Sequence, residues 1–164
     1  MALVIEDGSG KTNAQSYVSV ADVVAYADLY GLSHSHVTDA VVMRAMRYLE
    51  STYFERWIGV KKTEEQSLSW PRAWATRKDG YTQGESTVPV EVKNAACALA
   101  IRATPNVNLS PDITRSDAVI EEEVGPIRVK YRDNAPTVTI YRDVDAMLKP
   151  VLAMTGNSGR IWRS

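Results

Sequence analysis

Apolar side chains recur at helical spacing in four segments of this chain. In residues 20–30 they return every three or four positions, which predicts a helix that Ser19 caps and Gly31 ends. A second apolar stripe predicts a helix over residues 39–53, with Thr38 as its cap. These two segments, joined by a short polar loop, are expected to form a helical hairpin.

The third segment, residues 89–103, is apolar around most of its circumference and rich in alanine. Such a helix is expected at the centre of the molecule, with neighbours on more than one side. Pro89 suits its first turn, where no backbone N–H is needed. The fourth segment, residues 144–154, predicts a helix that Pro150 interrupts and kinks.

The period changes to two after the third helix. Ile127, Val129 and Tyr131 alternate with cationic residues, which predicts a β-hairpin over residues 118–132 around Gly125-Pro126. The expected fold class is mainly α: a small bundle of about four helices with a β-hairpin insertion and an extended C-terminal tail. Residues 1–154 are expected to form a single domain, and residues 155–164 the tail.

A long stretch without periodicity, Phe54 to Thr87, separates the second and third helices. It contains three tryptophans and three glycines, and a loop of this length is uncommon unless it is functional or packed onto something. Residues 54–80 carry six Lys/Arg against four acids. An excess of two is too small to indicate a nucleic-acid patch, so the interleaved aromatics favour a protein contact surface.

Composition adds few constraints. The 164 residues carry a formal net charge of −1, which weakens the case for a dedicated DNA-binding protein without excluding a local basic patch. The single cysteine, Cys97, excludes an internal disulfide within the chain. No apolar run approaches the length of a membrane span and no secretion signal is evident, so we expect folding in a cytoplasm.

No catalytic set, metal site or cofactor motif emerges from the spacing of reactive residues. His34 and His36 lack further ligands nearby, and Cys97 sits in an alanine-rich helix where a packing role is expected. Gly8-Ser9-Gly10-Lys11-Thr12 looks like the end of a phosphate-binding loop. The motif requires a glycine where this chain has Ile5, and no apolar helix follows, so a simple loop is expected.

Several motifs recur in a fixed order along the chain. An apolar start leads to Glu6-Asp7-Gly8-x-Gly10 and then Ser16-Tyr17-Val18-Ser19; Gln-x-Leu-x-Trp-Pro-Arg occupies residues 66–72, and Val-Gly-Pro-Ile-x-Val-x-Tyr residues 124–131. In this order they resemble the head-to-tail connector, or adaptor, proteins of tailed bacteriophages. Some members of that family are labelled DnaT-like single-stranded DNA-binding proteins. The resemblance covers nearly the whole chain.

The resemblance implies a structural protein of the virion neck that acts in viral genome packaging, is made in the host bacterial cytoplasm and uses no cofactor. It implies an oligomeric ring, usually a dodecamer, below the portal. Partners would be other copies of the chain, the portal protein and the next tail component, with double-stranded DNA passing through the channel without sequence-specific binding. No membrane partner is implied.

Candidate interface residues follow from the Trp-rich loop and the tail, which ends in an aromatic side chain between cations. They are Trp70, Arg72, Trp74, Arg160, Trp162 and Arg163. For Trp70 core packing is the alternative, because tryptophan is highly buried on average. The acidic run Glu121, Glu122 and Glu123 is interpreted either as a solvated hairpin edge or as a repelling lining of a DNA channel.

Two other functions stay open. A single-stranded DNA-binding module would need exposed aromatics for base stacking and a basic groove. An enzyme would need clustered acids with a metal, or a nucleophile beside a base, and the sequence shows neither spacing.

Overall fold

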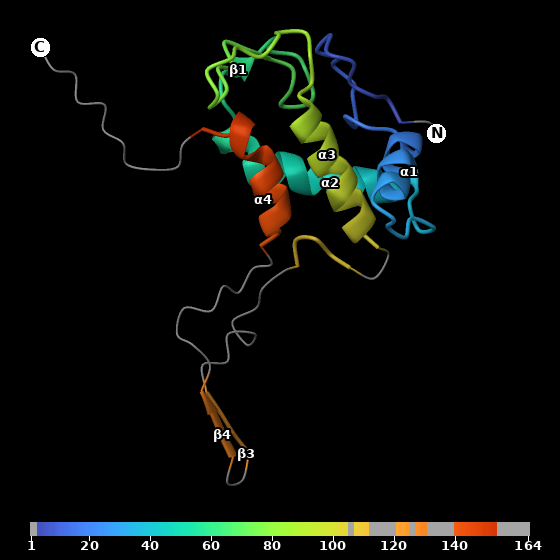
Figure 1. Cartoon of the computed structure of the whole chain (residues 1–164), viewed down its shortest axis with the longest axis vertical. Coiled ribbons are helices and arrows are strands. Elements are labelled where there is room, and N and C mark those ends of the chain that lie inside the picture. The colour runs from blue at the N-terminus through green and yellow to red at the C-terminus, as the bar shows by residue number, and fades with distance from the viewer. Residues whose placement is uncertain (1–2, 105–106, 112–120, 125–126, 131–139, 154–164) are drawn as a thin grey trace, which may run out of the picture.

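The computed structural model describes residues 3–104, 107–111, 121–124, 127–130 and 140–153. Within these residues the body of the protein consists of four α-helices: α1 (Val20–Leu29), α2 (Asp39–Tyr53), α3 (Val90–Arg102) and α4 (Arg142–Leu148). Figure 1 shows α3 crossing α2, with α1 and α4 on either side of it. The mainly α fold class predicted from the sequence is confirmed.

Helix α3 is central because nearly all of its circumference is apolar. Its residues Ala95–Ala100 are all buried, and it packs against α1, α2 and α4. Alanine side chains are small, so neighbouring helices can approach α3 on several sides. The helix begins at Val90 with Pro89 as its N-cap residue, one position later than predicted.

Helix α1 begins at a reciprocal capping box. The Ser19 side chain accepts a hydrogen bond from the Asp22 N–H (3.1 Å), and Asp22 Oδ2 accepts one from the Ser19 N–H (2.7 Å). Two backbone donors that a helix start leaves unpaired are thereby satisfied. Gly31 follows the helix with a φ of 64°, the left-handed conformation expected after a helix end. Thr38 precedes α2 without making a side-chain cap hydrogen bond.

Helix α4 differs most from the expected range. It begins at Arg142, two residues before the predicted start, and ends at Leu148. Pro150 then lies in a 3₁₀ turn, η3 (Lys149–Val151), because proline has no N–H to continue the α-helical ladder. The predicted end at residue 154 and the tail 155–164 lie outside the described residues.

The structure describes two short antiparallel pairs of strands. In one, β3 (Glu121–Val124) pairs with β4 (Ile127–Lys130), with Glu121 opposite Lys130, inside the hairpin predicted from the sequence. In the other, β1 (Val60–Lys61) pairs with β2 (Arg72–Ala73) within the Trp-rich stretch that was predicted to be irregular. A 3₁₀ turn, η1 (Phe54–Arg56), directly follows α2.

A polar cluster attaches the loop before β2 to α2. The Tyr17 hydroxyl donates to Glu50 Oε1 (2.5 Å), and Glu50 Oε2 accepts from both the Ser69 N–H and its hydroxyl. The Trp70 N–H donates to the Tyr17 oxygen (3.0 Å). Burial and the Glu50 carboxylate raise the pKa of Tyr17 well above its usual value, so this hydroxyl stays protonated and keeps donating.

Candidate nucleic-acid interface

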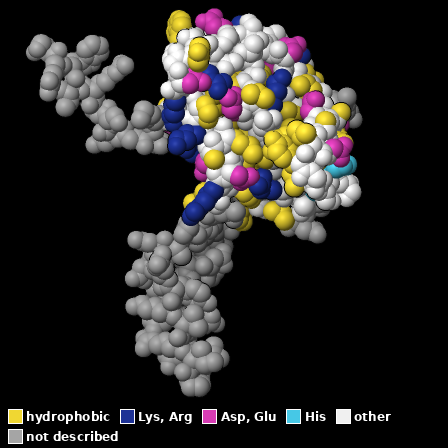
Figure 2. Space-filling view, viewed as in Figure 1, with side chains coloured by type: hydrophobic (Ala, Val, Ile, Leu, Met, Phe, Trp, Pro, Cys, Tyr) yellow, Lys and Arg dark blue, Asp and Glu magenta, His cyan; other side chains and the backbone are white. Residues whose placement is uncertain are grey.

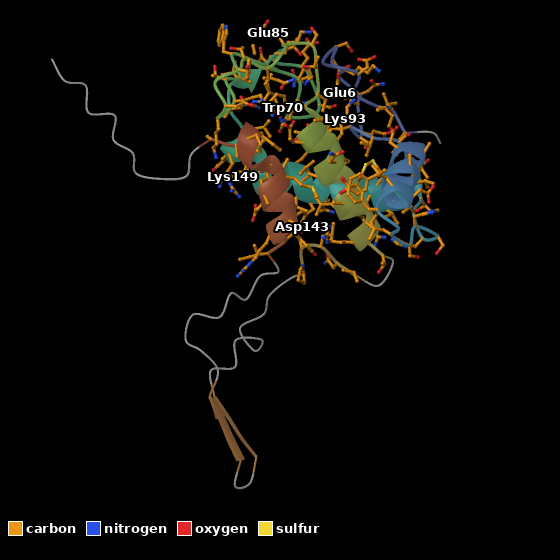
Figure 3. The ribbon with its side chains drawn as sticks, viewed as in Figure 1. Glu6, Trp70, Glu85, Lys93, Asp143 and Lys149 are labelled. Atoms are coloured by element: carbon orange, nitrogen blue, oxygen red, sulfur yellow. The ribbon has the colours of Figure 1, made fainter. Side chains whose placement is uncertain are left out.

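A basic cleft of about 350 Å³ lies where α4 and η3 meet η1 and the turn that follows β2. Four cationic side chains and one carboxylate line it, together with Ala146, Leu152 and Ala153: Arg56, Lys78, Arg142, Lys149 and Asp145. In Figure 2 dark-blue side chains gather on this side of the molecule, and Figure 3 labels Lys149 there. We call this feature the basic cleft.

Backbone hydrogen bonds join the three segments that form the basic cleft. The Ala153 N–H donates to the Arg56 carbonyl (2.6 Å), and the Lys78 N–H donates to the Pro150 carbonyl (3.3 Å). Trp57 also forms a β-bridge with Leu152. These contacts place cations from residues 56, 78 and 142–149 around one space, although they are far apart in the sequence.

Arg56 and Asp145 form the inner part of the basic cleft. The Arg56 guanidinium lies over the Tyr53 ring, 5.1 Å from its centroid, and its Nη1 is 3.6 Å from Asp145 Oδ1. The same carboxylate oxygen accepts a hydrogen bond from the Tyr53 hydroxyl (2.8 Å). Burial, followed by this bond, raises the pKa of Tyr53. Two neighbours therefore hold Asp145 in place, and it is one carboxylate among four cationic residues.

Positive charge in the basic cleft exceeds negative charge. Among the residues that the structure describes, no ion pair neutralises Lys78, Arg142 or Lys149, and all three are exposed. The Arg56 Nε atom is buried and has no hydrogen-bond partner within the described part of the chain. Such an arrangement attracts anions and can form charge-assisted hydrogen bonds to phosphate oxygens.

Exposed aromatic side chains lie close to the cationic ones in sequence. Phe54, 59% exposed, opens the turn that carries Arg56. Tyr81, 75% exposed, closes the turn that carries Lys78, because its carbonyl accepts the Arg77 N–H (2.8 Å). Exposed aromatics beside cations are the combination that binds unpaired bases and phosphates together.

The expected interface residues do not form one surface. Trp70 is fully buried and packs edge-to-face on Trp57, so its proposed role as an interface residue is wrong and the core alternative holds. Arg72 is half-buried and donates to the carbonyls of Ile58 and Gly59 (both 2.7 Å), where it links backbone segments instead of facing a partner. Burial lowers the pKa of Arg72. Trp74 is exposed, and its role at an interface stays a prediction.

The structure does not test the roles expected for the remaining candidate residues. Arg160, Trp162 and Arg163 lie outside the described residues. Glu121, Glu122 and Glu123 form most of strand β3, whose backbone alone is described. Their interpretation as a channel lining or a solvated edge stays a prediction.

The phosphate-loop-like segment is occupied by a carboxylate of its own chain. Glu6 is 1% exposed; its Oε1 accepts the N–H groups of Gly8 (2.8 Å) and Gly10 (2.9 Å), and its Oε2 accepts that of Lys11 (2.8 Å). Backbone N–H groups in such a concave turn bind anions. Because Glu6 already uses them, this loop offers no free site for a nucleotide phosphate.

Sequence reasoning missed the basic cleft. It counted Arg56 and Lys78 only within the charge of a loop, and it did not consider Arg142 and Lys149 together with them. One signal was present: Arg142, the first residue of α4, and Lys149, its C-cap residue, are seven residues apart, which is about two helical turns and places them on one side. The pairing of that side with residues 56 and 78 depends on tertiary contacts that no local pattern encodes.

Other reactive side chains in the described residues offer no competing site. Cys97 is buried, and this burial raises the pKa of its thiol to about 12, so the thiol stays protonated. No group of three His, Cys, Asp or Glu side chains that could hold a metal ion occurs in the part of the chain that the structure covers. None of the described helices is both long and apolar enough to span a lipid bilayer.

Comparison with known proteins yields one family. A family model described as "Putative DnaT-like ssDNA binding protein" matches residues 1–164. No curated protein and no solved structure matches the chain. The family description points to single-stranded DNA binding and not to a head-to-tail connector of a virion, so the expectation of a bacteriophage neck protein is corrected.

Proposed function

We propose that this chain binds single-stranded DNA along the basic cleft. The chain belongs to the family described as "Putative DnaT-like ssDNA binding protein". The observation that carries the proposal is the arrangement of four cations around a single carboxylate: Arg56, Lys78, Arg142 and Lys149 around Asp145. Phosphates of the strand would contact these cations, and the flexible backbone of an unpaired strand can follow a short, recessed surface.

The physical basis is the release of counterions. Each phosphate that a lysine or arginine neutralises frees a condensed cation, so binding weakens linearly on a log–log plot as salt rises. The slope for a single strand is about −0.7 per phosphate, so four contacts predict a slope of about −3. The net charge of −1 gives no overall attraction to DNA, so binding would depend on a local group of cations such as the basic cleft.

The test is a fluorescence anisotropy titration of the full chain with labelled oligothymidylate over a range of NaCl concentrations. The variant replaces two exposed cations of the cleft together, Arg142→Ser and Lys149→Ser. The matched control replaces two exposed cations elsewhere, Arg47→Ser and Lys93→Ser, so that both proteins lose the same net charge. Lys93 of α3 lies on the α1 side of the molecule and Lys149 on the α4 side (Figure 3).

The cleft variant is expected to bind several-fold more weakly, with a salt slope less steep by about 1.4. The control is expected to retain most of the affinity and the original slope. Equal losses in both variants would mean that only net charge matters and would refute the assignment to the cleft. A wild-type protein that does not bind the oligonucleotide at low salt would refute the function itself.

A further inference from the structure

Trp74 combines two features that rarely occur together without a functional reason. Its side chain is 76% exposed, although it is large and mainly apolar. Its φ is 53°, and it is the one non-glycine residue with a positive φ in the described part of the chain. A bulky residue is a genuine outlier in this region, where glycine is the usual occupant.

The surrounding structure holds the Trp74 backbone in this conformation. On one side, Ala73 pairs with Val60 in the β1–β2 ladder. On the other, Ala75 is fully buried and its carbonyl accepts the Gln83 N–H (2.8 Å). Gly59 lies directly against this segment: a Cβ at Gly59 would stand 2.4 Å from the Ala73 carbonyl oxygen. The segment is therefore fixed on both sides, and the indole is directed outward.

No aromatic contact among the described residues offsets the cost of the positive φ at Trp74. The ring–ring contacts of the Trp-rich region join Tyr53, Trp57 and Trp70, and among the described aromatic side chains Trp74 makes none. Strained conformations that the fold maintains without internal gain cluster at binding sites.

Trp74 lies within reach of the basic cleft. Lys78, which lines the cleft, is four residues further along the chain, a separation of at most about 14 Å. A second connection runs through residues 56–59, since Arg56 lines the cleft and Gly59 touches the Trp74 segment. A single strand of DNA whose phosphates lie in the basic cleft can therefore place a base against the Trp74 indole.

We infer that Trp74 stacks on an unpaired base and is the residue that makes this protein prefer single-stranded over duplex DNA. This inference rests on the proposed function. Bases within a duplex are already stacked and paired, so the indole has no free base face to contact there. The cations of the cleft act on phosphates, which both forms of DNA present.

The experiment measures the affinity of the full chain for oligothymidylate and for a hairpin duplex of the same number of phosphates. Trp74→Ala is expected to weaken binding to the single strand about tenfold and to leave duplex binding unchanged, because one stacked base is lost. Trp74→Phe keeps an aromatic face and is expected to retain most of the preference. Tyr30→Ala, which removes an exposed aromatic side chain at the end of α1, serves as the control and should change neither affinity.

Trp74→Gly separates binding from folding. Glycine relieves the positive φ, so this variant should unfold at a temperature no lower than that of Trp74→Ala, yet lose single-strand affinity to the same extent. Unchanged single-strand affinity in both variants, while the Arg142/Lys149 variant still binds weakly, would overturn the role of Trp74 and leave the proposed function standing. Equal losses for single-stranded and duplex DNA would also overturn it. No binding by the wild-type protein would instead refute the proposed function.

Discussion

Glu6 shows how one residue can change the meaning of a motif. The string Gly-Ser-Gly-Lys-Thr after it has the backbone donors of an anion-binding loop, and the loop does bind an anion, the Glu6 carboxylate. The sequence argument rejected a nucleotide site because the glycine expected at position 5 is absent. It did not foresee that the buried carboxylate would occupy the turn, since the direction of a side chain cannot be read from spacing.

We predict that Glu6→Gln lowers the free energy of unfolding by about 1–3 kcal/mol. The amide keeps one acceptor oxygen but directs an NH₂ group toward N–H donors of Gly8, Gly10 or Lys11, which leaves at least one buried donor without a partner. Urea denaturation followed by circular dichroism measures the change. The control is Asp7→Asn, the neighbouring exposed acid, which should be close to neutral. Equal stability of the two variants would contradict a structural role for the Glu6 carboxylate.

At the scale of elements, predictability follows the length of the repeating pattern. Helices α1, α2 and α3 were predicted to within one residue at each end, because ten or more residues give a stripe several turns long. Strands β1 and β2 contain two residues each and carry no alternation to detect. Their pairing depends on the cluster around Gln66 and Arg72, whose side chains bond to carbonyls of the surrounding loop.

The tight contact at Gly59 leads to a prediction about the stability of the Trp-rich stretch, Phe54 to Thr87. In Gly59→Ala, the new Cβ would meet the Ala73 carbonyl oxygen at 2.4 Å and the Ala75 backbone at 2.9 Å, so the β1–β2 pair must move apart. Gly80→Ala is the matched control, because Gly80 also has a positive φ but nothing within 4 Å of an added Cβ.

Both substitutions carry the cost of a left-handed alanine, about 1 kcal/mol, and Gly59→Ala adds an overpacking cost of about 1–3 kcal/mol. Thermal unfolding should therefore separate the two variants clearly. A Gly59→Ala protein as stable as Gly80→Ala would show that the β1–β2 pair makes room for the added Cβ at little cost in stability.

At the scale of the whole molecule, average charge and local charge give opposite impressions. The net charge of −1 argued against DNA binding, yet the fold gathers four cations around the basic cleft from three separate segments. The fold class could be predicted because the apolar pattern within each helical segment is enough to indicate a helix there. The cleft could not, because it depends on which helix ends meet. The order of motifs gave a resemblance to a family, but such an order carries no information about the surfaces that the fold creates.

Asp145 is the remaining negative charge in the basic cleft, and its removal should strengthen DNA binding. In Asp145→Asn the amide oxygen can still accept the Tyr53 hydroxyl, so the local structure should persist while a charge that competes with phosphate for Arg56 is lost. A unit charge at about 4 Å contributes about 1 kcal/mol in water, which corresponds to an affinity about fivefold higher at low salt.

Asp143→Asn is the matched control for this charge, two residues away on the same helix. Its carboxylate pairs with Arg102, and it does not line the basic cleft. Both variants lose one negative charge, so a uniform field effect would strengthen binding equally, whereas a local effect of the cleft should favour Asp145→Asn. The titration with labelled oligothymidylate at several salt concentrations distinguishes these outcomes, and a stronger effect of Asp143→Asn would place the DNA outside the cleft.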